Sequence, residues 1–289
     1  METAVIRLAD VSYVRLGTRD LKGATRFATD YLGLEIAERA KGAVYFKSDE
    51  RDHTLCYFDG SPKDQVVCFE VERKSDLGDA ATELEAMGHE VEHGSREQAD
   101  LRKVRDFVSF MDPSGNRIEL AWGPACSGRR HHGQRDAGIT GFSHIGLCST
   151  DLVRDETFWT RVTNARVSDR IGDAPLLRID RIHHSIALFP ATRPGIQHIN
   201  HQVETGDDVM RSYQFLREHQ VNMVFGPGRH PTSMAQFLYF DGPDGMVFEY
   251  SSGVREIADE LLWRERQFPF EPKGFCKWGA KPAVAEFSE

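Results

Sequence analysis

Two histidines and one glutamate in the C-terminal half of the chain have the residue types and setting of a metal site. His144, His198 and Glu249 lie in strand-like runs, FSHIGL, IQHINHQVET and MVFEY. Side chains of a strand alternate between its two faces, so residues of such runs can share one inward face. Two imidazoles and a carboxylate on one face of an octahedral ion leave the other positions open, as in non-haem iron(II) oxygenases, and manganese is the alternative ion. We therefore expect these residues to bind a divalent metal.

The chain also contains an internal duplication. VSYVRLGTRDL at 11–21 resembles FSHIGLCSTDL at 142–152, and HTLCYF at 53–58 resembles HSIALF at 184–189, both at an offset of 131. These matches predict two related domains.

The duplication provides an internal control for the metal site. The N-terminal residues that align with the three candidate ligands are, in order, Tyr13, Val66 and Glu119. Tyrosine and valine cannot replace two imidazoles, so the N-terminal copy cannot form the same site. We expect the metal in the C-terminal domain alone.

The segment 124–138, PACSGRRHHGQRDAG, separates the two copies and is rich in glycine and charge without an apolar period. We therefore predict an N-terminal domain without metal at 1–123, a linker at 124–138 and a catalytic domain at 139–253. Residues 254–289 are expected to begin as an amphipathic helix near Arg255 and to pack over the body or a neighbouring subunit.

Each domain is predicted to consist of two βαβββ modules. Apolar residues at helical spacing predict helices near 21–31, 77–87, 152–162 and 207–219, and short β-branched or aromatic runs lie between them. The expected class is α+β, with two tandem domains whose modules form curved, barrel-like mixed sheets.

These motifs resemble those of the type I extradiol ring-cleavage dioxygenases of the vicinal oxygen chelate superfamily, over residues 6–252. FSHIGL resembles the motif of the first iron-binding histidine, IQHINHQVET that of the second, and FLYFDGPDGMVFEY the strand pair that ends in the glutamate ligand. The resemblance implies four βαβββ modules, Fe(II) in the C-terminal domain, and meta cleavage of a catechol-type diol by dioxygen.

The resemblance also implies roles for three residues around the substrate. It implies that His184, in HHSIALFP, is the acid/base, and that His230, in GPGRHPTS, and Tyr239, in FLYF, stabilise developing charge on oxygen. A structural role for His184 stays open because His53 occupies the matching N-terminal position. Solvent exposure of His230 and a core position for Tyr239 are the alternative readings. We expect His183, on the opposite face of the predicted strand, to be a bystander.

Composition narrows the function classes. With 289 residues, a formal charge of -9 and no long apolar run, the chain is expected to bind neither nucleic acid nor membrane. Five cysteines without a CxxC pair and an N-terminus without an export signal predict the cytoplasm. The expected partners are a small aromatic diol and O2, and we expect a homo-oligomer.

Two other function classes fit parts of the sequence. One is another metal-dependent enzyme of the same superfamily, a glyoxalase-like isomerase or a thiol transferase, whose ligands usually come from both halves or from two chains. The other is a non-catalytic small-molecule-binding protein, which does not need His144, His198 and Glu249 together. Among diols, monocyclic catechols, biphenyl-type diols and hydroquinone-like rings all fit the sequence.

Overall fold

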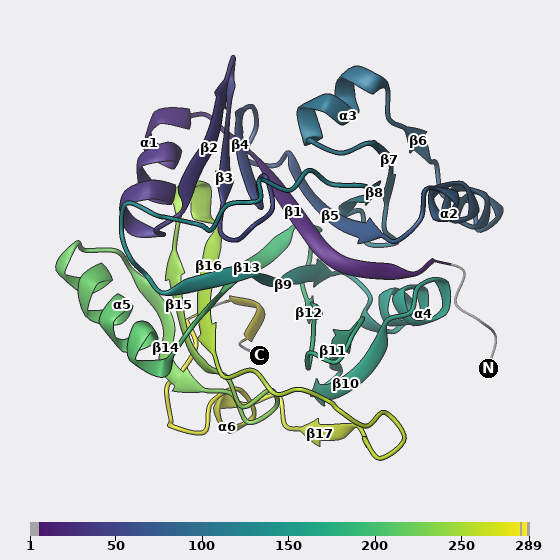
Figure 1. The fold of residues 1–289 in the computed structure, drawn as a ribbon. Coiled ribbons are helices and arrows are strands. Elements are labelled where there is room, and N and C mark those ends of the chain that lie inside the picture. Colours follow the sequence, from purple (N-terminus) through teal and green to yellow (C-terminus); the bar gives the residue numbers. More distant parts are fainter. Residues whose placement is uncertain (1–5, 284, 288–289) are drawn as a thin grey trace.

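Two curved mixed sheets form the body of the molecule (Figure 1). The computed structural model describes residues 6–283 and 285–287. The first sheet has eight strands in the order β2-β3-β4-β1-β5-β8-β7-β6, and the second has nine in the order β14-β15-β16-β13-β9-β12-β11-β10-β17. The α+β class and the curved mixed sheets predicted from the sequence are confirmed, and the sheets are not closed barrels.

The strands of the first sheet are β1 (Leu8–Thr18), β2 (Glu35–Ala40), β3 (Ala43–Lys47), β4 (Leu55–Asp59), β5 (Gln65–Val71), β6 (Glu92–His93), β7 (Asp106–Met111) and β8 (Arg117–Trp122). Those of the second are β9 (Ile139–Ser149), β10 (Arg166–Ile171), β11 (Ala174–Arg178), β12 (Ile186–Pro190), β13 (Ile196–Val203), β14 (Met223–Arg229), β15 (Gln236–Asp241), β16 (Val247–Ser252) and β17 (Arg266–Phe268).

The helices are α1 (Leu21–Arg26), continued by the π-turn η1 (Phe27–Tyr31), α2 (Lys74–Ala86), α3 (Arg96–Arg102), α4 (Leu152–Val162), α5 (Gly206–Glu218), the short η2 (Pro243–Gly245), α6 (Pro272–Phe275) and η3 (Ala285–Phe287). Each of the four modules runs strand, helix and then three strands, with α3 inserted between β6 and β7 of the second module, and α1, α2, α4 and α5 are the crossover helices. No helix among the described residues is long and apolar enough to cross a bilayer.

The two sheets share one hydrophobic core. β1 and β9 lie side by side at the centre of the molecule (Figure 1). Phe27 of η1 packs on Phe248 of the second sheet, with 5.5 Å between ring centroids, and Trp159 of α4 packs on Phe69 of the first at 5.4 Å. Because each half supplies a helix to the other, the halves hold each other in place.

The C-terminal segment differs from the sequence prediction. No helix begins near Arg255: residues 258–265 have no regular helix or strand, and β17 then adds an edge strand to the second sheet by pairing with β10. Leu261 and Leu262, which suggested the apolar face of a helix, lie exposed on a turn. The apolar residues that do bind the body, Phe275 and Phe287, come later in the segment.

Candidate metal centre

The three predicted ligands lie on neighbouring central strands of the second sheet. His144 of β9 pairs with Asn200 of β13, and Glu249 of β16 pairs with the same Asn200 from the other side. His198 precedes Asn200 by two residues and therefore projects from the same face of β13. The register of three adjacent strands thus brings together side chains that are up to 105 positions apart in the sequence.

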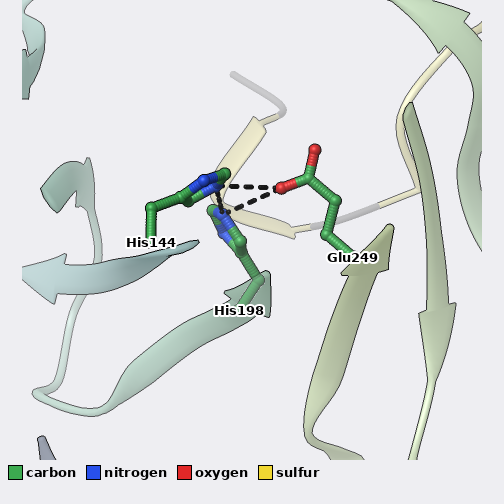
Figure 2. A group of neighbouring side chains, drawn as sticks. All are labelled: His144, His198 and Glu249. Carbon is green, nitrogen blue, oxygen red and sulfur yellow. Dashed lines mark hydrogen bonds and ion pairs between the residues drawn. The ribbon is translucent and has the colours of Figure 1, made fainter. Parts of the chain in front are cut away.

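The ligand atoms of these residues converge (Figure 2). Nε2 of His144 lies 3.0 Å from Nε2 of His198 and 2.9 Å from Oε2 of Glu249, and Nε2 of His198 lies 3.5 Å from the same oxygen. Ligand bonds of about 2.1 Å at right angles separate neighbouring ligand atoms by about 3.0 Å. The spacing therefore fits one divalent ion, and the three side chains are each at most 3% exposed.

The charges in this cluster also fit a cation. Burial lowers the pKa of His198 to about 3, so its ring is neutral at physiological pH. Burial would raise the pKa of the Glu249 carboxyl, but the surrounding imidazoles outweigh this effect and hold it well below its usual range. Oε2 of Glu249 has no hydrogen-bond donor within the described part of the chain. A buried carboxylate oxygen beside imidazole lone pairs is a donor set suited to a metal ion.

Two neighbours of His198 fix its ring. Nδ1 of His198 is hydrogen bonded to Oε1 of Gln197, which places the ring proton on Nδ1 and leaves Nε2 free as a ligand. The ring lies directly over Gly146, where a Cβ atom would come within 2.3 Å of Nδ1 and 2.6 Å of Cε1. Gly146 therefore leaves the space that the His198 ring occupies on the adjacent strand.

Of the three further residues predicted for the site, His184 lies beside the first ligand. Its ring centroid is 4.3 Å from that of His144, and the residue is 7% exposed. It precedes β12 rather than lying in a strand, so the expected placement of His183 on an opposite strand face is wrong. His183 is instead fully buried, and its Nδ1 lies 3.1 Å from Nδ1 of His184.

His230 and Tyr239 lie on the other side of the carboxylate. Nε2 of His230 is 3.4 Å from Oε1 of Glu249 and 3.3 Å from the hydroxyl of Tyr239. Nδ1 of His230 donates to the backbone carbonyl of Phe275 in the C-terminal segment, at 2.8 Å. The segment 231–240 contains no acidic residue that could bind Nδ1 of His230. The backbone carbonyl of Phe275 is its partner instead. Burial and the nearby Glu249 raise the pKa of Tyr239 well above its usual value, which keeps its hydroxyl protonated and able to donate.

Aromatic residues wall this side of the site. Phe287, from the C-terminal segment, is 4% exposed and packs on Phe189, Phe225 and Tyr239, with centroid distances of 4.6, 6.0 and 5.9 Å. An apolar wall favours a ring-shaped substrate and keeps water away from polar groups.

The N-terminal sheet has a different group at the matching place. Tyr13 and Glu119 occupy the positions equivalent to His144 and Glu249, and the Tyr13 hydroxyl donates to Oε2 of Glu119 at 2.7 Å. Arg102 of α3 binds Oε1 of Glu119 through Nε and Nη2, at 2.8 and 2.6 Å. A guanidinium thus neutralises the carboxylate of this domain. His53 stacks on Tyr13 at 5.0 Å, much as His184 lies beside His144.

Two similar domains, with the candidate metal ligands in the second one alone, are the features by which this chain can be assigned to a family. The family model of the Glyoxalase/Bleomycin resistance protein/Dioxygenase superfamily matches residues 10–120 and 141–250, and the chain belongs to this family.

Named relatives are similar along nearly the whole chain. An iron-dependent extradiol dioxygenase of Rhodococcus jostii (strain RHA1) is 27% identical over 90% of this chain and 94% of its own length. A 3-methylcatechol 2,3-dioxygenase of Pseudomonas putida is 28% identical over 86% of this chain and 91% of its own length.

Solved structures share the fold. A halotolerant catechol dioxygenase, BphC, superposes with a TM-score of 0.87 at 23% identity, covering 98% of this chain and 97% of its own. A Mn(II)-bound glyoxalase from Novosphingobium aromaticivorans superposes with a TM-score of 0.85 at 25% identity, covering 98% of this chain and 94% of its own.

Sequence reasoning missed several residues that support the site. Gly146 could have been found, because the internal alignment places Arg15 opposite it and a glycine that appears only in the metal-binding copy indicates a close approach. Gln197 and the Phe275 carbonyl carry no such signal, since their contacts depend on tertiary packing.

Proposed function

We propose that this chain is an Fe(II)-dependent extradiol dioxygenase, which opens the ring of a catechol-type diol with O2. The observation that carries the proposal is the convergence of two imidazole nitrogens and one carboxylate oxygen beside His184, His230 and Tyr239. The names of the relatives over the full two-domain length support it.

In this proposal His144, His198 and Glu249 would hold the metal ion, which would supply Lewis-acid chemistry to a diol hydroxyl and activate O2. His184, on the His144 side, accepts and returns the substrate proton. His230, held at Nδ1 by the Phe275 carbonyl, positions the Tyr239 hydroxyl, and this hydroxyl donates a hydrogen bond to oxygen that gains charge during the reaction. Phe189, Phe225 and Phe287 exclude water and contact the aromatic ring.

The ion, the compartment and the assembly are further parts of the proposal. We propose Fe(II) rather than Mn(II), and metal analysis after anaerobic purification tests this choice. We place the enzyme in the cytoplasm because its five cysteines are all unpaired thiols. We propose a homo-oligomer, supported by exposed Leu261 and Leu262 on one turn, and light scattering tests it.

Oxygen uptake by the Fe(II)-loaded protein tests the activity. Catechol, 3-methylcatechol, biphenyl-2,3-diol and 1,2-dihydroxynaphthalene form the panel, and at least one is expected to consume stoichiometric O2 with a yellow ring-opened product. His198→Ala and Glu249→Gln should lose metal and activity together, while the matched N-terminal variants His53→Ala and Glu119→Gln keep the metal. Stoichiometric iron and full turnover in His198→Ala would refute the ligand assignment.

The Mn(II)-bound glyoxalase with the same fold makes an isomerase the second candidate. An isomerase rearranges its substrate without consuming O2. Turnover of a thiol adduct by the Mn(II)-loaded protein, with no oxygen uptake on any diol, would favour this candidate over the dioxygenase.

A further inference from the structure

His183 and Asp169 form a buried pair next to the candidate site. Both residues are 0% exposed, and Nε2 of His183 lies 2.7 Å from Oδ2 of Asp169. On its other side, Nδ1 of His183 lies 3.1 Å from Nδ1 of His184. The three side chains therefore make a continuous hydrogen-bonded chain that ends beside the first metal ligand.

Arg266 of the C-terminal segment neutralises the carboxylate of this chain. Its position is fixed by the pairing of β17 with β10, in which Arg266 lies opposite Asp169. Nε and the backbone N–H of Arg266 both donate to Oδ1 of Asp169 at 3.0 Å, and Nη2 donates to Oδ2. Since a guanidinium already balances the carboxylate, a second positive charge on His183 is not needed there.

The charge states in this chain follow from burial and these contacts. Burial would raise the pKa of Asp169, but hydrogen bonds from His183 and Arg266 outweigh it, so the carboxyl is ionised. Burial lowers the pKa of His183 despite the nearby carboxylate, so the ring is neutral.

A neutral imidazole has one donor nitrogen and one acceptor nitrogen. The carboxylate of Asp169 can only accept, so Nε2 of His183 must carry the ring proton. Nδ1 of His183 is then an acceptor, and the facing Nδ1 of His184 must be its donor. Nε2 of His184 is left without a proton, and it makes no hydrogen bond within the described part of the chain.

We propose that His183 is a positioning residue, which holds His184 in the Nδ1–H tautomer so that Nε2 can accept the proton of a substrate hydroxyl. This inference rests on the proposed function and deepens it. Asp169 fixes the polarity of the chain, and Arg266 makes the C-terminal segment part of that device. His183, expected from the sequence to be a bystander, thus determines which ring nitrogen of His184 accepts a proton.

The N-terminal domain offers an internal comparison. The sheet registers place Leu55 and Ile186 at equivalent positions, so Asp52 and His53 correspond to His183 and His184. Nδ1 of His53 is 3.8 Å from the Asp52 carboxylate, beyond hydrogen-bond distance. The histidine partner therefore occurs in the copy that has the candidate metal site and is replaced by an acid in the copy that lacks it.

Nitrogen-15 NMR of the histidine rings in the metal-free protein tests the tautomer without any assay of activity. We expect a protonated Nδ1 and an unprotonated Nε2 for His184 in the parent. The His183→Leu variant should lose this preference, whereas His183→Asn, whose Oδ1 can replace Nδ1 as the acceptor, should keep it. A His184 ring protonated on Nε2 in the parent would overturn the proposal, whether or not any variant folds.

Steady-state kinetics then tests the consequence. In the Fe(II)-loaded protein, His183→Leu should lower kcat by about 10- to 100-fold, the usual effect of losing a partner that orients a site residue. KM for the diol should change less than about threefold. His183→Asn should recover most of the loss, and the matched Asp52→Asn control should turn over like the parent. Parent-like kcat in His183→Leu would sink the inference, whereas failure of the parent on every diol would refute the proposed function and leave the NMR result standing.

Discussion

At the scale of single residues, the candidate site depends on small supporting groups as much as on its ligands. Gln197 and Gly146 orient His198, the first by a hydrogen bond and the second by leaving room for the ring. Neither binds the ion in our proposal. A change at either position should therefore alter metal affinity while all three ligands remain.

Gly146→Ala tests this dependence. The new Cβ would lie within 2.3 Å of the His198 ring, which must rotate or shift away from Glu249. We expect metal affinity to fall by about 10- to 100-fold, as for other changes next to a ligand. Isothermal titration with Fe(II) or Mn(II) under anaerobic conditions measures it. Gly78→Ala in α2, where a Cβ meets nothing within 4 Å and the backbone is helical, is the control for substitution of a glycine as such.

The internal comparison at residue scale also shows what the sequence could predict. The two candidate histidine ligands could be inferred because histidine replaces tyrosine and valine at matched strand positions, whereas Glu249 is matched by another glutamate, Glu119. His183 could not be evaluated in this way, because its partner Asp169 is 14 positions away in the sequence and the two meet only in the folded protein.

At the scale of elements, the two sheets stabilise equivalent carboxylates by different means. Glu249 faces imidazoles, whereas Glu119 faces Arg102 at the end of α3. Ser95 and Gln98 cap the start of α3 reciprocally, as in a capping box. The S-x-x-Q spacing of Ser95 and Gln98 could have indicated the start of this helix. The helix is too short to show an apolar period, so hydrophobic periodicity does not reveal it.

Replacing Arg102 should destabilise the N-terminal domain. Arg102→Met leaves Glu119, which is 0% exposed, without its cation, and loss of one partner of a buried ion pair costs about 3 to 5 kcal/mol. Urea unfolding followed by tryptophan fluorescence measures the free energy of unfolding. The double variant Arg102→Met/Glu119→Gln should recover part of the loss, since it removes the buried charge. An unchanged unfolding midpoint in the single variant would contradict this account.

The β7–β8 turn should give the protein a pH-dependent stability. Asp112 is 3% exposed and accepts hydrogen bonds from the backbone and side chain of Asn116, whose Nδ2 also binds the Cys148 carbonyl in the second domain. Burial raises the pKa of Asp112 to about 6, with Asp155 adding to the effect. The folded state therefore holds a proton that the unfolded chain releases at lower pH.

The sign of the effect follows from this difference. Because the folded pKa is the higher one, the contribution of Asp112 is fully present below about pH 4 and is lost as pH rises through about 6, by at most about 3 kcal/mol. Urea unfolding of parent and Asp112→Asn at pH 4.5, 5.5 and 7 separates this group from others that titrate. The parent should lose stability relative to the variant as pH rises, and parallel pH profiles would refute the prediction.

At the scale of the whole molecule, the C-terminal segment completes the site of the second domain. It supplies Arg266 to Asp169, the Phe275 carbonyl to His230 and Phe287 to the aromatic wall. The four-module architecture followed from hydrophobic periodicity and the duplication. The path of this segment did not, because the run IADELLW fits an amphipathic helix, whereas in the structure Leu261 and Leu262 lie exposed on a turn.

Two truncations separate these contributions. A stop after Gly279 removes Phe287 but keeps Arg266 and Phe275, so it should weaken diol binding and raise KM while kcat changes little. A stop after Gly253 removes all three, so kcat should fall by at least about tenfold while the three ligands still bind metal. Steady-state kinetics and metal analysis give both readouts. Equal effects of the two truncations on kcat would contradict a separate role for Arg266 and Phe275.

The guanidinium that sits on Glu119 has a consequence for how the protein meets its metal in the cell. Arg102 is part of the chain, so the positive charge beside Glu119 does not depend on the iron supply and cannot be removed by a chelator. The carboxylate of the N-terminal half is therefore neutralised by the fold of the chain itself. In our proposal the carboxylate of the second half, Glu249, is instead neutralised by an ion from outside the chain. During iron starvation the enzyme should accumulate as an ordered, inactive reserve, and hydrogen exchange should show protection in the first sheet and looser protection around His144 and His198 until metal is restored.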